Sequence, residues 1–280
     1  MKEANSIISV LQQQGYYTMA FHQGLRGNYN RDKKYVEMGF DDCWFADDME
    51  FYELVHGNIS DKSGYDFIIE KYEQRDSSKP FFAYNLTRQN HISYRTNIDI
   101  TVHPTSGFEG MEEQASIYLS CLRKSDNAFQ HLTEHFSQVE RPVIICMLGD
   151  HDPDYAASVT KKEGLNDAVQ KYGEKCTPLL IWANYGLDKD DWEITSMPYV
   201  VPKLLKAAGM DESAYYTYLN EMSEQVPILT AYESYCDADG LIHDYADEKK
   251  YSDLILNYWY FEYYNVHEKE KKSNVFFQAL

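Results

Sequence analysis

One stretch of the sequence places an acid and a histidine directly after an apolar run. Asp150 and His151 follow Val143–Leu148 and Gly149. An apolar run that stops abruptly at polar residues is typical of a buried parallel strand that ends in a loop. Ligands of open α/β sheets bind beyond the carboxyl ends of strands, so this pair predicts half of a divalent-metal site. The alternative is that Asp150 caps a helix and His151 is an ordinary loop residue.

The residues around this pair extend the hypothesis without deciding it. Asp152 and Asp154 add carboxylates just beyond it, as further metal ligands or as acceptors that orient the ligands. Gly149 is expected to let the backbone turn sharply. Two adjacent residues that can bind a metal are a weak signal. On these residues alone, the metal site and the helix cap with a loop histidine both remain possible interpretations.

Two other apolar runs also lead into polar residues, namely Tyr16–His22 (YYTMAFH) and Pro80–Leu86 (PFFAYNL). The first ends in His22 and is followed by a loop rich in Gly and Asn that leads to Arg31. The second is followed by a polar segment that reaches His91. Because parallel strands place their carboxyl ends along one edge of a sheet, these side chains are expected to converge with the Asp-His pair.

Two histidines, an arginine and a metal ion are groups that could bind an anionic ester and assist its cleavage. The metal would offset charge, the guanidinium would fork onto a phosphate or sulfate, and a histidine would serve the leaving oxygen. Each residue also has a structural interpretation: His22 as a satisfied core histidine, Arg31 as a surface ion-pair partner and His91 as a loop hydrogen-bond donor.

The composition describes a globular α/β protein of 280 residues, with 44% hydrophobic and 25% charged residues. A formal charge of −19 argues against nucleic acid as a partner, because phosphates would be repelled. The five cysteines show no CxxC spacing, which predicts neither a disulfide framework nor a zinc site. No run reaches the roughly 18 apolar residues of a membrane span, and the first residues do not lead into a signal peptide.

Alternating helices and strands predict one mostly parallel sheet flanked by helices on both faces. We expect an α/β domain over residues 1–212 and a helical, aromatic-rich extension over 213–280, packed on the same domain. The segment Phe40–Phe51 is expected to be an acidic loop. The expected helices are Ser6–Gln14, Lys33–Met38, Gln114–Val139 and Tyr199–Ala208, with a further capped helix after Ser60, and the remaining expected strand is Thr177–Trp182.

The aromatic part of the extension, Tyr251–Tyr264 (YSDLILNYWYFEYY), has apolar residues at positions 254, 255, 258, 259 and 261. This spacing favours a helix packed on the core, and the alternative is a platform for glycan or lipid.

Taken together, these segments resemble the lipoteichoic acid synthase-like branch of the sulfatase and alkaline phosphatase superfamily. The resemblance runs through most of the chain and keeps the family's order. It rests on GYYTMAFHQGLRGNYNRDKKYVEMGFDD, GNISDKSGYDFIIEKYE, PFFAYNLTRQNH, VIICMLGDHDP, TPLLIWANY, MPYVVPKLLKAAGM and LILNYWYFEYYNV.

The resemblance implies a metal-dependent enzyme that attacks a phosphate or sulfate ester, with a phosphoglycerol lipid as the typical substrate in this branch. By position, Asp150 and His151 match metal ligands, and manganese is the typical metal, with magnesium and calcium as alternatives. Arg31 and His91 match phosphate contacts, and His22 matches a histidine that lines the same pocket. The full-length family works on cell-envelope polymers at the extracellular face of a bacterial membrane, to which an N-terminal segment anchors it.

The resemblance also shows departures. Gly24 stands where some synthases have an acidic substrate contact, and Tyr29, the matching substrate-side aromatic, replaces a tryptophan. The family's first metal-binding acid and its threonine nucleophile would lie upstream of Met1, so we expect no nucleophile in this sequence. Two hypotheses follow: the carboxyl-terminal part of a phosphoglycerol transferase or hydrolase, or a catalytically silent protein of the same fold that binds anions or glycolipids.

Overall fold

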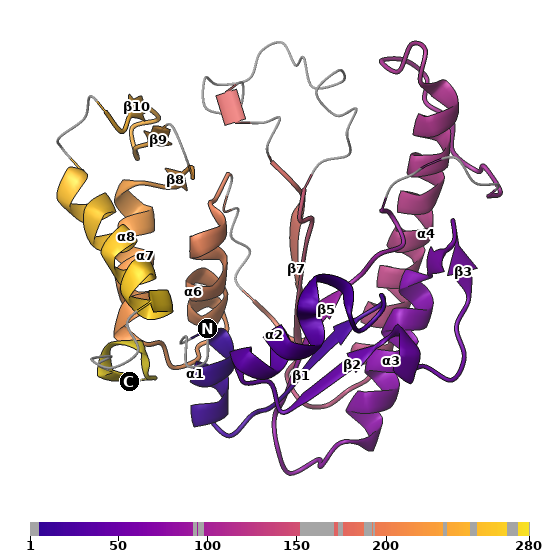
Figure 1. Cartoon of the computed structure of the whole chain (residues 1–280), viewed down its shortest axis with the longest axis horizontal. Helices are drawn as coiled ribbons and strands as arrows, with labels where there is room; N and C mark the ends of the chain where they lie inside the picture. The colour runs from indigo at the N-terminus through magenta and orange to yellow at the C-terminus, as the bar shows by residue number, and fades with distance from the viewer. Residues whose placement is uncertain are drawn as a thin grey trace.

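The computed structural model describes residues 6–91, 94, 98–151, 171–172, 176–187, 192, 194–231, 234–246, 251–267 and 274–279. Sheets and helical layers alternate, as Figure 1 shows, which confirms the expected α/β class. The helices of the described residues are α1 (Ile7–Gln13), α2 (Arg31–Met38), α3 (Asp61–Gln74), α4 (Glu112–Phe136), α6 (Met197–Ala207), α7 (Ala214–Gln225) and α8 (Ser252–His267), with short 3₁₀ helices η1 (Asn28–Asn30), η2 (Ala46–Asp48) and η5 (Asn274–Phe277). The strands are β1 (Tyr17–His22), β2 (Asp42–Phe45), β3 (Leu54–Val55), β4 (Asn58–Ile59), β5 (Phe81–Leu86), β6 (Ile144–Leu148), β7 (Leu179–Ala183), β8 (Ile228–Leu229), β9 (Ser234–Cys236) and β10 (Ile242–Asp244).

The parallel sheet has the order β2-β1-β5. Its register places His22, the last residue of β1, opposite Phe45 on one side and Leu86 on the other. The three carboxyl ends therefore lie along one edge, as the sequence predicted for β1 and β5.

Strand β2 corrects one expectation, because it lies inside the segment expected to be an acidic loop. Phe45 is fully buried beside Tyr35 and Ala20, whereas Trp44 packs on the opposite side of the sheet against Phe67. Successive side chains that point to opposite sides of the sheet are typical of a strand. The acidic residues just before Trp44 and Phe45 obscure this pattern in the sequence.

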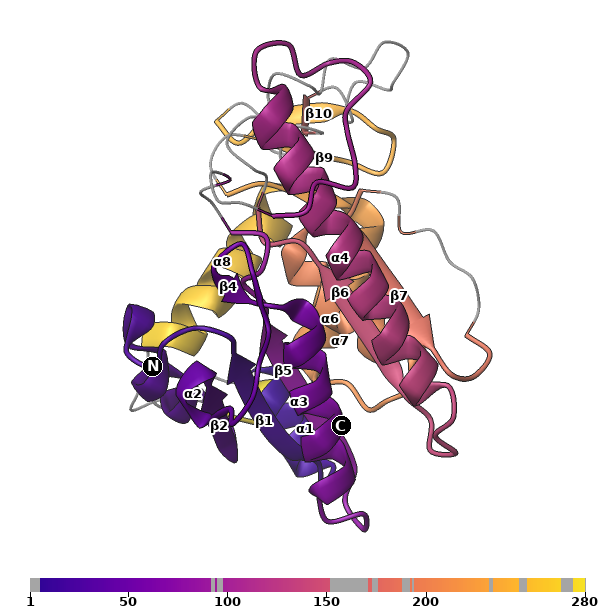
Figure 2. The ribbon, with the colours of Figure 1, turned by 90° about the vertical axis from the view of Figure 1, so that its right-hand side faces the viewer.

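Strand β6 corrects a second expectation. It was expected to be a buried parallel strand, but its partner among the described residues is β7, which runs antiparallel to it. Met147 and Leu148 are each 36% exposed. The β6–β7 ribbon stands between α6 and the parallel sheet in Figure 1, and α4 crosses it in Figure 2.

Helices cover both faces of the sheet. On one face, Met19 and Phe21 of β1 share a hydrophobic cluster with residues of α3 and α4 and with Ile145 and Trp182 of the β6–β7 ribbon. This cluster joins the two sheets beneath the same helices (Figure 2). On the other face, Ile8 of α1 packs with residues of β1 and α2.

The segment after residue 212 contains helices, as expected, and also a three-stranded antiparallel sheet of order β10-β9-β8 that was not expected. In α8, Ile255 is 3% exposed and belongs to a core cluster shared with α1 and α7, so core packing is the role of this helix's inner side. Trp259 departs from the expectation, since it is 42% exposed and its ring contacts Tyr245. Within the described part of the chain, no helix is both long and apolar enough to cross a membrane.

A pair of phenylalanines tests this arrangement. Phe21 is fully buried against the ring of Phe67, at a centroid distance of 4.6 Å, whereas Phe51 is 82% exposed. We expect Phe21→Ala to lower the free energy of unfolding by about 3–5 kcal/mol, because it leaves a cavity, and Phe51→Ala to change it by less than about 0.5 kcal/mol. Urea unfolding followed by circular dichroism measures both, and similar values for the two variants would contradict the core described above.

Candidate functional site

His22 is held at the carboxyl end of β1 with both ring nitrogens engaged. The side chain is 3% exposed, and Nδ1 lies 3.1 Å from the carbonyl oxygen of Leu86 on the neighbouring strand. Because a carbonyl oxygen only accepts, Nδ1 carries the proton and donates it. Nε2 then presents a lone pair to Nη1 of Arg31, 3.3 Å away.

The surroundings favour the neutral form of His22. Burial lowers the pKa of the imidazole, the hydrogen bond to Leu86 opposes this shift, and the charges of Arg31 and Arg88 lower the pKa further. His22 is therefore a neutral base with a fixed tautomer at pH 7. Arg88, which follows β5, is a second cation near this ring that the sequence analysis did not single out.

Gly24 leaves the space that the His22 ring occupies. A Cβ atom at position 24 would lie 2.5 Å from Nε2 of His22. An acidic side chain, which the resemblance implies here for some relatives, would therefore have to displace the imidazole from this arrangement.

Arg31 is presented by an unusual turn. Tyr29 and Asn30 have φ values of 56° and 55°, in the left-handed region that residues other than glycine seldom adopt. Two such residues in succession are a strained feature of the kind found at functional sites. The turn stacks the Arg31 guanidinium on the ring of Tyr29, 4.8 Å from its centroid, and that ring is 84% exposed.

Arg31 differs in its charge balance from the nearby Arg26. Arg26 binds Asp48 at 2.6 Å, so its charge is neutralised. Among the described residues no carboxylate forms an ion pair with Arg31. The guanidinium of Arg31 is thus not neutralised by a described carboxylate and can bind an external anion.

Tyr84 of β5 interacts electrostatically with two parts of the site. One is the anion side, formed by His22 and Arg31, and the other is Asp150 at the end of β6. Burial raises the pKa of the Tyr84 hydroxyl, the charge of Arg31 lowers it, and the charge of Asp150 raises it. One phenol therefore lies within electrostatic reach of both groups. Tyr84 was not predicted from the sequence, although a hydroxyl inside an apolar strand, two residues before its end, was a usable signal.

Asp150 and His151 lie together at the end of β6. Their side chains are 70% and 69% exposed, and Nε2 of His151 lies 3.6 Å from Oδ2 of Asp150. A carboxylate and an imidazole so placed fit half of a site for a divalent ion. Within the described part of the chain no group of three or more possible metal ligands forms, and Asp152 and Asp154 lie outside it.

Gly149 has a different role from the one expected. Its φ is not positive, but a Cβ atom there would lie 2.9 Å from the Cβ of Thr177, whose hydroxyl donates to the Gly149 carbonyl at 2.8 Å. The glycine permits close packing of the two strand ends of the β6–β7 ribbon, and this contact fixes the backbone just before Asp150.

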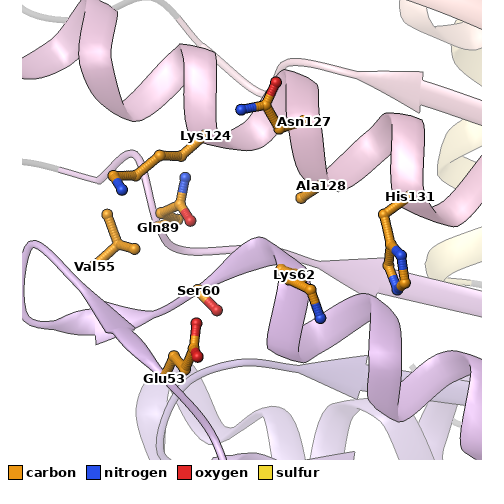
Figure 3. A pocket seen from close by; sticks show the side chains of 9 residues that line it. All are labelled: Glu53, Val55, Ser60, Lys62, Gln89, Lys124, Asn127, Ala128 and His131. Atoms are coloured by element: carbon orange, nitrogen blue, oxygen red, sulfur yellow. The ribbon is translucent and has the colours of Figure 1, made fainter. Parts of the chain in front are cut away.

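His91 is exposed, in a turn in which its amide donates to the carbonyl of Arg88 at 3.1 Å. A cavity of about 310 Å³ lies between α3 and α4 and is lined by Gln89 and Lys124, among others (Figure 3). No residue predicted to bind the anion or the metal lines it. The candidate site is therefore the surface formed by the strand ends, not this cavity.

His22 thus lies at the carboxyl end of β1 with Arg31 and Arg88 close to it, and the Asp-His pair follows β6 in a second sheet. The Sulfatase family model matches residues 1–210, and the chain belongs to the sulfatase family. A protein of Rhizobium meliloti (strain 1021) named "Putative cyclic beta-1,2-glucan modification protein" is 22% identical over 98% of this chain. The chain spans 44% of that relative's length.

Solved structures share the fold. Phosphoglycerol transferase GacH of Streptococcus pyogenes, solved in complex with sn-glycerol-1-phosphate, has a TM-score of 0.67 and 20% identity, over 90% of this chain and 61% of that one. The lipoteichoic acid synthase LtaP of Listeria monocytogenes has a TM-score of 0.60 and 14% identity, over 96% of this chain and 74% of that one. The C-terminal periplasmic domain of EcEptC from Escherichia coli has a TM-score of 0.58. These likenesses support the fold expected from the resemblance.

The state of His22 is directly measurable. We expect NMR titration to give a pKa below the ordinary value of 6.5, and Arg31→Ala to raise it without restoring that value, because burial is the larger cause. Arg26→Ala is the matched control and should leave the pKa unchanged. Since the unfolded chain binds this proton more readily, His22 should make folding less favourable as the pH falls below about 6.5. A pKa above 6.5 in the wild-type protein would contradict the burial and the tautomer described here.

Proposed function

We propose that this chain acts on a phosphate ester as part of a metal-dependent phosphoglycerol transferase or hydrolase of cell-envelope polymers. The observation that carries the proposal is the pairing of Arg31, which has no carboxylate partner among the described residues, with the neutral Nε2 of His22. A cation beside an unprotonated imidazole suits a substrate that has both an anionic group and a hydroxyl. The similarity in fold to a phosphoglycerol transferase solved with sn-glycerol-1-phosphate supports phosphate over sulfate.

Each residue has a defined role in this proposal. Arg31 forks onto two non-bridging oxygens, and Tyr29 holds the guanidinium by stacking and covers one side of the substrate. The Nε2 atom of His22, which faces Arg31 in this structure, accepts a hydrogen bond from a substrate hydroxyl once the guanidinium turns to the phosphate oxygens, because Nδ1 is committed to Leu86. His91 donates to a further phosphate oxygen or to the leaving oxygen.

Asp150 and His151 are the proposed metal ligands, with manganese as the typical ion and magnesium or calcium as alternatives. A divalent ion bound there would offset negative charge on the phosphate and on an attacking oxygen. In the described ranges no serine, threonine or cysteine hydrogen-bonds to His22 or Arg31, and the proposal assigns no nucleophile.

The first test of the function is anion binding. We expect sn-glycerol-1-phosphate or phosphate to bind with a Kd of roughly 1 mM, to shift the NMR signals of His22 and His91, and to bind more weakly as salt is added. Arg31→Ala should weaken binding at least about tenfold, whereas Arg26→Ala should not, because Arg26 is neutralised by Asp48. Equal binding by the two variants would refute the site. Anion binding alone is expected of both hypotheses, so ester turnover in the presence of manganese is the result that would exclude the catalytically silent protein.

The second test concerns the metal. With two protein ligands among the described residues, manganese should bind no more tightly than roughly micromolar, and Asp150→Ala should abolish what binding there is. Asp211→Ala is the control, since Asp211 is exposed and lies between α6 and α7, at none of the strand ends that form the candidate site. Calorimetry measures both, and nanomolar binding would mean that further residues complete the site.

A further inference from the structure

A buried glutamine follows each of the two strands that carry the anion side of the site. Gln23 comes directly after His22 at the end of β1, and Gln89 lies two residues before His91 in the segment after β5. Their side chains are 2% and 1% exposed. Glutamine is mostly exposed in proteins, and a buried amide is unfavourable unless it is hydrogen-bonded. The role of two such residues beside the site therefore needs an explanation.

Gln89 joins the loop after β5 to two helices. Its Oε1 accepts from the backbone N–H of Asp61, the first residue of α3, at 3.0 Å. Its Nε2 donates to Ser125 Oγ at 2.9 Å and to the carbonyl of Cys121 at 3.1 Å, both in α4. The turn that ends at His91 is thereby fixed to α3 and α4 from inside, and Figure 3 shows Gln89 between these helices, at the wall of the cavity.

Gln23 joins the end of β1 to the same helix start and to the other loop. Its Oε1 accepts from the backbone N–H of Arg88 at 3.3 Å, and its Nε2 lies 3.5 Å from the carbonyl of Ser60, the N-cap of α3. The amide packs directly on Gly64, where a Cβ atom would lie 1.4 Å from Nε2. Only glycine at this position leaves room for Gln23.

Asp61 stabilises the start of α3, to which both glutamines are hydrogen-bonded. It is 3% exposed and its Oδ2 accepts from Ser125 Oγ at 2.5 Å, while Asn90 donates to the same hydroxyl at 2.9 Å. Burial raises the pKa of Asp61 to about 6, and the hydrogen bond from Ser125 opposes the rise, so the carboxylate form prevails above neutral pH. A carboxylate in the first turn of a helix is also favoured by the helix dipole.

We propose that Gln23 and Gln89 are positioning residues, which set the placement of His22 relative to His91 by binding both strand-end loops to the first turn of α3. The proposal rests on the anion-binding function proposed above. In this arrangement the glutamines do not touch the anion. They determine whether the two histidines reach it together.

The decisive variant is Gln89→Met, which keeps the length of the side chain and removes its hydrogen bonds. Phosphate is titrated to saturation at a temperature at which circular dichroism shows the variant folded, and the histidine signals are followed by NMR. We expect His91 to lose its phosphate-induced shift, His22 to keep its own, and the affinity to fall about fivefold. Retention of both shifts, or loss of both in a folded protein, would overturn the proposal. If Gln89→Met does not fold, Ser125→Ala removes one of its partners and is judged by the same outcomes.

Failure of the anion-binding function gives a different result. In that case the wild-type protein shows no phosphate-induced shift at His22 or His91. Amide hydrogen exchange without ligand then tests the glutamine alone, because the His91 amide is hydrogen-bonded to Arg88. Faster exchange of that amide in Gln89→Met would support positioning, and an unchanged rate would exclude it.

Gly64→Ala tests Gln23, with Gly186→Ala as its control, since a Cβ atom at position 186 meets nothing within 4 Å. We expect Gly64→Ala to lower phosphate affinity about fivefold and Gly186→Ala to leave it unchanged. Adding Gln23→Ala to Gly64→Ala removes the clash, so the melting temperature should recover while the affinity stays low. If affinity recovers together with stability, Gln23 has a packing role only and the proposal fails for this residue.

Discussion

The site depends on one hydrogen bond, from Nδ1 of His22 to the carbonyl of Leu86, at 3.1 Å. These two residues are register partners of the parallel strands β1 and β5, so the bond requires the strands to pair in this register. A slip of one residue would turn the side chain of His22 to the opposite face of the sheet. The bond also fixes the tautomer, which leaves Nε2 as the atom that faces Arg31. Strand pairing thus determines which ring nitrogen carries the proton.

Charge at the site is set locally, against the charge of the whole molecule. The formal charge is −19, which repels anions at long range. Arg31, stacked on Tyr29, and Arg88 place positive charge beside His22, and both lower its pKa. Keeping the imidazole neutral avoids burying a charge that no acid would neutralise. The nearby Arg26 shows the contrast, because its pairing with Asp48 removes it from any such role.

The two sides of the site differ in how firmly they are built. The anion side is set by β1 and β5, whose loops are joined to α3 by buried amides of Gln23 and Gln89. The proposed metal side lies at the end of the half-exposed β6–β7 ribbon, and Asp150 and His151 are largely exposed. The charge of Asp150 nevertheless reaches Tyr84, which also responds to Arg31. The shared cluster beneath α3 and α4 packs β1 with the β6–β7 ribbon.

The sequence by itself determined the α/β class, helices α1, α2, α4, α6 and α8, the start of α3 and strands β1, β5 and β7 to within a few residues, because apolar periodicity and glycine stops are local properties. It also pointed to His22 and Arg31, since polar residues at strand ends are visible in the chain order. It could not determine which residues pair across the sheet: β2 was hidden among acids, and β6 was expected to be parallel but pairs with β7 in the antiparallel sense. Interactions between residues far apart in sequence, such as the packing of Gln23 on Gly64 and the effect of the Asp150 charge on Tyr84, follow from tertiary packing, which is decided only when the whole chain excludes water from its core.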